Sequence, residues 1–234
     1  MRSKQSGFTL VEIAIVLVII GLLLGGVLKG QELINSAKVK NIANDLNGIA
    51  AGVYAYQDRY KAFPGDDKAA SSHWTGVTNG DGNGIVGTSA TTTNFNDAFA
   101  GTTENVLFWR HMKNGGFVAG DKATNEWPRN TLGGIVGVQT GSGDPLTPDL
   151  GGLVVCTSNL TGKIAESIDL QFDDGKGNSG TLRGYRQNAS ATATSADTPT
   201  EGDGDTSNFT RKAAGVAAYD ATSDIKLYTI CKSL

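Results

Sequence analysis

The chain has 234 residues, of which 20 are Lys or Arg and 23 are Asp or Glu, so its formal net charge is −3. With 32 glycines and this charge balance, the sequence does not favour a nucleic-acid partner, which would need a basic surface along a phosphate backbone. It also contains neither a Gly-rich Lys-Ser/Thr phosphate loop nor a recognisable nucleophile, base and orienter set, so no catalytic residue is assigned and an enzyme is not expected.

The first predicted element is an apolar helix from Phe8 to Leu28, whose one charged side chain is Glu12. A helix of this length spans about 31 Å, enough to cross the hydrocarbon core of a bilayer. A carboxylate in that layer costs a few kcal/mol, so Glu12 requires a partner. A plain signal anchor is the alternative interpretation, but its cleavage motif would follow the apolar segment rather than precede it.

Residues Lys4-Gln5-Ser6-Gly7 followed by Phe8-Thr9-Leu10-Val11-Glu12 resemble the class III signal of type IV pilins and type II secretion pseudopilins. The resemblance implies that a prepilin peptidase cleaves after Gly7 and methylates the new N-terminal residue, Phe8. It also implies that Glu12 pairs with the terminal amine of a neighbouring subunit, and that an assembly ATPase and its membrane platform extract the helix into a filament. The subunit would be stored in the inner membrane before assembly.

From Val39 onward, apolar residues recur at alternating spacings of three and four, which predicts one buried helix face. They are Val39, Ile42, Leu46, Ile49, Val53, Tyr56, Tyr60 and Phe63. We expect the sheet of the head to cover this face, with a free coiled-coil dimer as the alternative, and we expect Pro64-Gly65 to end the helix near Ala62. The predicted organisation is a leader (1–7), a transmembrane or filament-core half-helix (8–28), an amphipathic half-helix (29–62) and a globular head (63–234).

The segment Asn79-Gly80-Asp81-Gly82-Asn83-Gly84-Ile85-Val86 is similar to the first part of a calcium loop, with oxygen-bearing side chains at alternate positions. Its closing acidic residue is missing, because Ala90 stands at that position. A series of Asn-Gly and Asp-Gly turns is therefore the favoured interpretation, with Asn79, Asp81 and Asn83 as calcium candidates; no other cofactor is expected. His73 and His111 have no metal ligands at suitable spacing and are predicted to be surface histidines.

The rest of the head predicts two helices and four strands. Thr102 or Thr103 and Gly115-Gly116 bound a short helix around residues 104–112, and a second helix is expected from Leu160 to Phe172. β-Branched runs predict strands at residues 135–138, 153–156, 181–185 and 225–231. The Ser/Thr/Ala-rich segment 188–200 predicts an exposed loop.

The two cysteines, Cys156 and Cys231, are expected to pair, because the export signal places them in an oxidising compartment. Two free buried thiols are the alternative. Such a pair resembles the C-terminal disulfide region of type IV pilins. We therefore predict a pilin-like α+β fold: a long N-terminal helix packed on an antiparallel sheet, with a disulfide-closed C-terminal region.

The expected function is that of a structural subunit of an extracellular type IV pilus, a helical filament of identical copies. Two alternatives share the same signal. One is a periplasmic pseudopilin of a type II secretion system, and the other is a minor pilin that acts as a calcium-dependent tip adhesin.

Overall fold

A computed structural model describes residues 9–87, 104–140, 150–187, 199–200, 218–222 and 226–234. The chain divides into two compact units, Met1–Lys38 and Val39–Leu234. Helix α1 (Leu10–Tyr60) begins in the first unit and ends in the second.

In the first unit, α1 carries a continuous apolar surface. Its large hydrophobic side chains are exposed, from Leu10 at 85% and Leu22 at 73% to Ile20 at 46%. Within the described residues, α1 has the length and the apolar composition needed to cross a membrane, with a mean hydropathy of 2.8 in its most apolar window. A helix that is apolar on all sides requires a cover of lipid or of other helices.

In the second unit, the apolar face predicted for α1, here called its seam, is buried in the core of the head. Val39, Ile42, Leu46, Ile49, Val53 and Tyr56 are all buried, and Tyr60 and Phe63 pack partly against the same core. The core also contains side chains from β1, β2, β5 and α3, so residues of the chain's own head cover the seam, as predicted. The helix ends at Tyr60, slightly before Ala62, because Lys61 adopts a positive φ of 57°.

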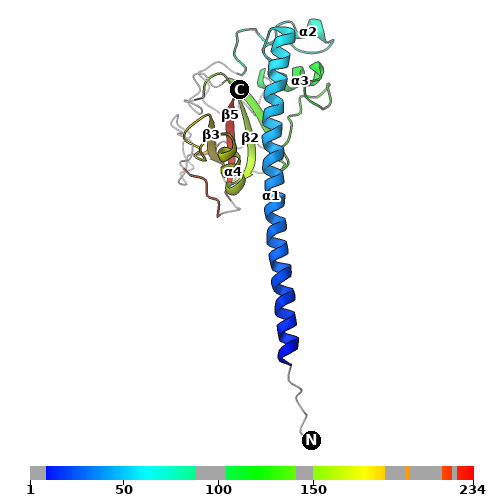
Figure 1. Cartoon of the computed structure of the whole chain (residues 1–234). Helices are drawn as coiled ribbons and strands as arrows, with labels where there is room; N and C mark the ends of the chain where they lie inside the picture. The colour runs from blue at the N-terminus through cyan, green and yellow to red at the C-terminus, as the bar shows by residue number, and fades with distance from the viewer. Residues whose placement is uncertain (1–8, 88–103, 141–149, 188–198, 201–217, 223–225) are drawn as a thin grey trace. The chain divides into compact units, whose positions relative to one another are not determined.

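The sheet has five antiparallel strands in the order β1-β2-β5-β3-β4. They are β1 (Val136–Thr140), β2 (Leu153–Thr161), β3 (Leu182–Gln187), β4 (Pro199–Thr200) and β5 (Leu227–Ser233). The C-terminal strand β5 pairs with both β2 and β3 and lies between them (Figure 1). All four predicted strands are present, and β4 is a two-residue addition at the edge.

Three further helices complete the described part of the head: α2 (Ala70–His73), α3 (Glu104–Gly115) and α4 (Gly162–Phe172). Phe108, Trp109 and Met112 of α3 are fully buried and belong to the same core as the seam of α1. Gly52 of α1 allows this close approach, because a Cβ there would lie 2.7 Å from Cε of Met112. Helices α3 and α4 confirm the two helices predicted from sequence.

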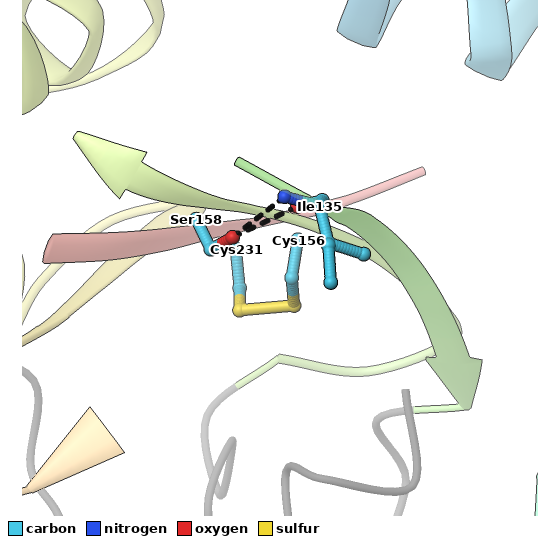
Figure 2. Close-up of a disulfide and its surroundings, with 4 residues drawn as sticks. All are labelled: Ile135, Cys156, Ser158 and Cys231. Carbon is cyan, nitrogen blue, oxygen red and sulfur yellow. Dashed lines mark hydrogen bonds between the residues drawn. A yellow bond between two sulfur atoms is a disulfide. The ribbon is translucent and has the colours of Figure 1, made fainter. Parts of the chain in front are cut away.

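The disulfide joins Cys156 to Cys231, and the two residues are direct partners on the neighbouring strands β2 and β5 (Figure 2). Both are fully buried. Beside the disulfide, Ser158 Oγ bonds both backbone groups of Ile135, accepting from N at 2.8 Å and donating to O at 3.1 Å. The predicted pairing is confirmed, and together with the long helix and the antiparallel sheet it gives the predicted pilin-like α+β fold.

Candidate functional site

Glu12 lies in the first turn of α1 and forms a capping box with Thr9. The Thr9 backbone N and Oγ1 both donate to Glu12 Oε2, at 2.8 and 2.7 Å, and the Glu12 N donates to Thr9 Oγ1 at 3.3 Å. A threonine followed three residues later by glutamate is the usual signature of this arrangement. This second role of Glu12, as a helix cap, was not predicted from the sequence, although the spacing Thr9-x-x-Glu12 indicates it.

The capping contacts use one oxygen of the carboxylate. Both bonds from Thr9 fall on Oε2, and Oε1 makes no hydrogen bond to the described residues. The side chain is exposed, so this second oxygen is open to a partner from outside the chain. Gly7 and Phe8, the predicted cleavage and methylation residues, lie outside the described residues.

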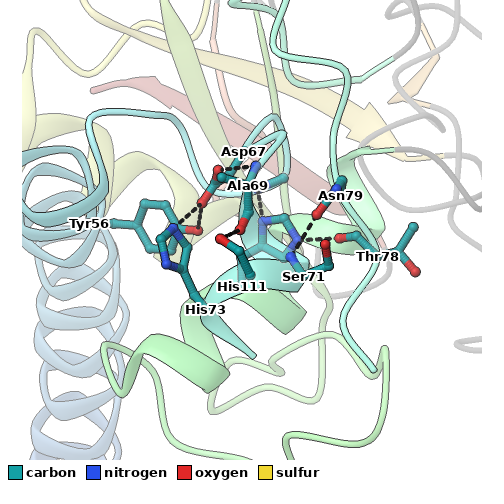
Figure 3. A network of polar contacts seen from close by, with 10 residues as sticks. Tyr56, Asp67, Ala69, Ser71, His73, Thr78, Asn79 and His111 are labelled. Atoms are coloured by element: carbon teal, nitrogen blue, oxygen red, sulfur yellow. Dashed lines mark hydrogen bonds and ion pairs between the residues drawn. The ribbon is translucent and has the colours of Figure 1, made fainter. Parts of the chain in front are cut away.

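The loop that follows α1 is organised by a buried polar network (Figure 3). Asp67 accepts a hydrogen bond from the Tyr56 hydroxyl at 2.8 Å and another from the Ala69 backbone N at 2.8 Å. Nearby, His111 Nδ1 accepts from the Gly65 backbone N at 2.9 Å, and its Nε2 lies 2.8 Å from the Thr78 carbonyl oxygen. The accepting Nδ1 fixes the proton on Nε2, which donates to Thr78.

His111 is therefore a structural histidine of the core and not the surface residue expected from sequence. It is fully buried, and its ring stacks on Tyr56 with 9° between the planes. Burial holds its pKa below the ordinary value of 6.5. The prediction failed because both of its partners are backbone groups at distant positions, which no spacing rule detects. The other histidine, His73, is exposed as predicted.

The three calcium candidates differ in how the structure uses their oxygens. Asn79 Oδ1 accepts from the Ser71 backbone N at 2.6 Å, and Asn83 Oδ1 accepts from the Ile85 backbone N at 2.7 Å. These amide oxygens thus stabilise turns. Asp81, the third candidate, lies in a group of three carboxylates.

That group consists of Asp66, Asp81 and Glu104, whose nearest oxygens lie within 4.8 Å of one another. Asp66 and Glu104 were not singled out by sequence, because they lie on different segments from Asp81. Burial raises the pKa of the Glu104 carboxyl to about 7, and the neighbouring charges of Asp81 and Asp66 add to this rise. Burial also raises the pKa of Asp66, against the effect of the backbone N–H groups that bond it.

A second acidic group, Asp169, Asp173 and Asp174, lies between α4 and β3. Here hydrogen-bond donors of the chain engage every carboxylate. The donors are Tyr219 Oη and Gly175 N for Asp169, Thr181 N and Leu182 N for Asp173, and Lys176 N and Ser179 Oγ for Asp174. This group stabilises the turn that leads from α4 into β3.

Comparison with known protein families finds a match in the N-terminal part of the chain. The model of the prokaryotic N-terminal methylation motif matches residues 2–28, which contain the predicted leader, Glu12 and the apolar part of α1. No curated protein matches the chain. The motif and the apolar helix fit anchoring in a membrane before assembly. The match at residues 2–28 is a class III signal, which is characteristic of type IV pilins and pseudopilins.

Proposed function

We propose that this chain is the structural subunit of a type IV pilus, processed by a prepilin peptidase and polymerised through its N-terminal helix. The observation that carries the proposal is the class III signal in residues 2–28, with Glu12 in the first turn of an exposed apolar helix. The peptidase removes residues 1–7 and methylates the amine of Phe8. The family to which the signal belongs is structural, and we assign no catalytic residue.

The apolar surface of α1 supports this function energetically. Side chains such as Leu10, Leu22 and Leu28 are 85%, 73% and 67% exposed in the single chain. In the inner membrane, lipid covers them, and in the filament the same surfaces of neighbouring subunits cover one another. An assembly ATPase and its membrane platform supply the work of extraction from lipid.

Glu12 sets the register of neighbouring subunits in this proposal. Cleavage creates a charged amine on Phe8, and burying it in the filament core without a partner would cost about 3–5 kcal/mol. The Oε1 atom of Glu12 accepts a hydrogen bond from that amine of the neighbouring subunit, while Oε2 keeps its hydrogen bonds from Thr9. The same carboxylate then caps its own helix and holds the next one.

A pseudopilin of a type II secretion system and a minor pilin at a filament tip use the same signal. They differ from the proposed major subunit in location and abundance. A major subunit supplies the whole lattice of an extracellular filament, a minor one is found only at tips, and a pseudopilin stays in the periplasm.

The test has two parts. Intact-mass analysis of the chain from cells that contain prepilin peptidase should show a chain that begins at Phe8 and is heavier by one methyl group. The same chain from peptidase-deleted cells should begin at Met1. Cryo-EM of filaments sheared from the native cell should then show this chain throughout the lattice. Assembled protein that still begins at Met1 would overturn the proposal, and a lattice built from another subunit would leave the minor-pilin function in its place.

A further inference from the structure

We propose that Asp66, Asp81 and Glu104 form a calcium site that fastens the loop after α1 to the start of α3. The three carboxylates come from three separate segments of the head, and their oxygens lie within 4.8 Å of one another. The site is independent of the leader and of Glu12, so it stands or falls separately from the proposed function.

All three carboxylates accept hydrogen bonds from the backbone, and that of Asp81 accepts from the Asn83 N at 2.9 Å. Asp66, 4% exposed, accepts from the Asn83 N and the Gly84 N, each at 2.9 Å. Glu104, 8% exposed, uses Oε1 to accept from the Asp81 N at 2.9 Å. Asp81 itself is exposed, so the group is buried on one side and open to solvent on the other. A preformed, partly open set of oxygens of this kind suits an ion that enters from water.

The close approach of these segments depends on two glycines. A Cβ at Gly65 would meet the carbonyl group of Glu104, and a Cβ at Gly80 would meet the backbone of Gly65 and Asp66. The backbones of the loop and of α3 are therefore in direct contact around the carboxylates. This geometry brings together acidic groups that would otherwise repel one another.

An unsatisfied oxygen points independently to a ligand. Glu104 Oε2 is buried and has no hydrogen-bond partner among the described residues, and Glu104 as a residue is 8% exposed. Such an atom normally costs about 1–3 kcal/mol, more if it is charged. In addition, no lysine, arginine or histidine of the described ranges forms an ion pair with any of the three carboxylates. A bound cation supplies both the missing partner of Oε2 and the missing positive charge.

The ligand set favours calcium over other metals. All three side chains offer carboxylate oxygen and no nitrogen or sulfur, which is unlike a zinc site. Calcium accepts oxygens at 2.3–2.6 Å in a flexible geometry, whereas magnesium demands a near-ideal octahedron and keeps several waters. The observed spacing, within 4.8 Å, is compatible with calcium.

The site also differs from the local loop considered in the sequence analysis. The closing acid that is missing at Ala90 is supplied by Glu104, from the first turn of α3. Of the three local candidates, Asp81 is kept as a ligand, while the side-chain oxygens of Asn79 and Asn83 serve Ser71 and Ile85.

The second acidic group provides a matched control within the same chain. Asp174 lies in an equally tight group, but among the described residues no buried oxygen of that group lacks a hydrogen-bond partner. If clustering of carboxylates alone attracted calcium, both groups would bind it. If the unsatisfied oxygen matters, only the group with Glu104 binds it.

The test uses the full chain purified in detergent, stripped with a chelator and then titrated with calcium chloride. Isothermal titration calorimetry should give one calcium ion per chain. At a calcium concentration of 100 times Kd, the Tm of the head should rise by roughly 5–10 °C. Asp81→Asn and Glu104→Gln should each weaken binding by roughly tenfold or more and lose most of this rise, whereas Asp174→Asn should behave as wild type.

A fold control separates loss of the site from loss of the head. In chelator, Asp81→Asn and Glu104→Gln should melt at or above the wild-type temperature, because each removes one of three neighbouring negative charges. The proposal is overturned if calcium leaves the wild-type Tm unchanged or if both substitutions keep wild-type affinity. It is also overturned if Asp174→Asn abolishes binding, since the ion would then lie between α4 and β3.

Discussion

Buried polar side chains hold the loop after α1 at the residue scale. Asp67 is 2% exposed and His111 is fully buried, and each is satisfied by partners far away in the sequence. Asp67 accepts a hydrogen bond from the hydroxyl of Tyr56 on the seam of α1, while His111 accepts one from the backbone N of Gly65. Since a buried polar group without its partner is costly, these contacts fix the path of a loop that has few apolar residues.

The neutral form of His111 makes a pH-dependent contribution to stability. Its pKa in the folded chain lies below 6.5, so the unfolded chain binds more protons between these two values. The contribution is therefore fully present above about pH 6.5 and is lost as the pH falls through the window toward the lowered pKa. Glu104 has its pKa raised to about 7, so when no cation is bound its contribution to stability decreases as the pH rises, opposite to that of His111.

The measurement compares the pH dependence of Tm between wild type and a histidine variant, so the contribution of the carboxylates, present in both, cancels. We expect the Tm of the full chain in detergent to fall less steeply between pH 7.5 and pH 5.5 in His111→Gln than in wild type. An identical pH dependence in wild type and His111→Gln would contradict a buried neutral imidazole.

At the scale of the elements, the packing of α1 against α3 could be predicted only in part. The spacing of Val39 to Tyr56 correctly identified the buried face, because helical periodicity is a local property of the sequence. The partner, α3, is recognisable by its own caps, but the pairing of the two depends on Gly52 and on Met112, and no local pattern links them. The polar groups that anchor the loop after α1 bond partners far away in the sequence, so no local pattern predicts their contacts.

Two glycines on α1 test this packing. Gly52→Leu should destabilise the head by about 1–3 kcal/mol, because the new side chain must displace Met112 and Phe117. Gly48→Leu is the control, since a Cβ there meets nothing within 4 Å, and it should stabilise the helix by roughly 0.5–1 kcal/mol. Thermal melts of the full chain in detergent would contradict the packing if both substitutions had the same sign.

The disulfide makes a second prediction at this scale. It closes a loop with a sequence separation of 75, and it joins the central strand β5 to β2. Cys231→Ser should therefore lower the free energy of unfolding by about 2–4 kcal/mol, largely through the unfolded chain. Cleavage after Gly7 should continue as in wild type, since the signal lies in residues 2–28. The prediction fails if reduction of the wild-type chain leaves its melting curve unchanged.

At the scale of the whole molecule, the two units differ in how much of their function the sequence reveals. The signal and Glu12 are contiguous, so the sequence alone predicts the family. The carboxylate group of the head is assembled from Asp66, Asp81 and Glu104, and its members become neighbours only when the loop folds back on α3. Cys156 and Cys231 are an intermediate case, because two cysteines in an exported chain leave one intramolecular pairing.

Assembly through the N-terminal helix is the central claim, and Glu12 has two roles that must be separated to test it. Glu12→Gln keeps the capping box with Thr9, because glutamine serves at the same position, but it removes the charge. Thr9→Ala removes the cap and keeps the charge. Neither change adds a charge to the apolar span, so both variants should insert into the membrane as wild type does.

The decisive measurement is a shear assay on cells that carry only one variant, with immunoblots of the membrane and sheared fractions. We predict that Glu12→Gln and Glu12→Ala accumulate in the membrane and yield few or no filaments, because the amine of Phe8 would be buried without a carboxylate. Thr9→Ala should assemble close to the wild-type level. A wild-type yield of filaments from Glu12→Gln would contradict the account, since Glu12 would then act as a helix cap and not as the contact between subunits.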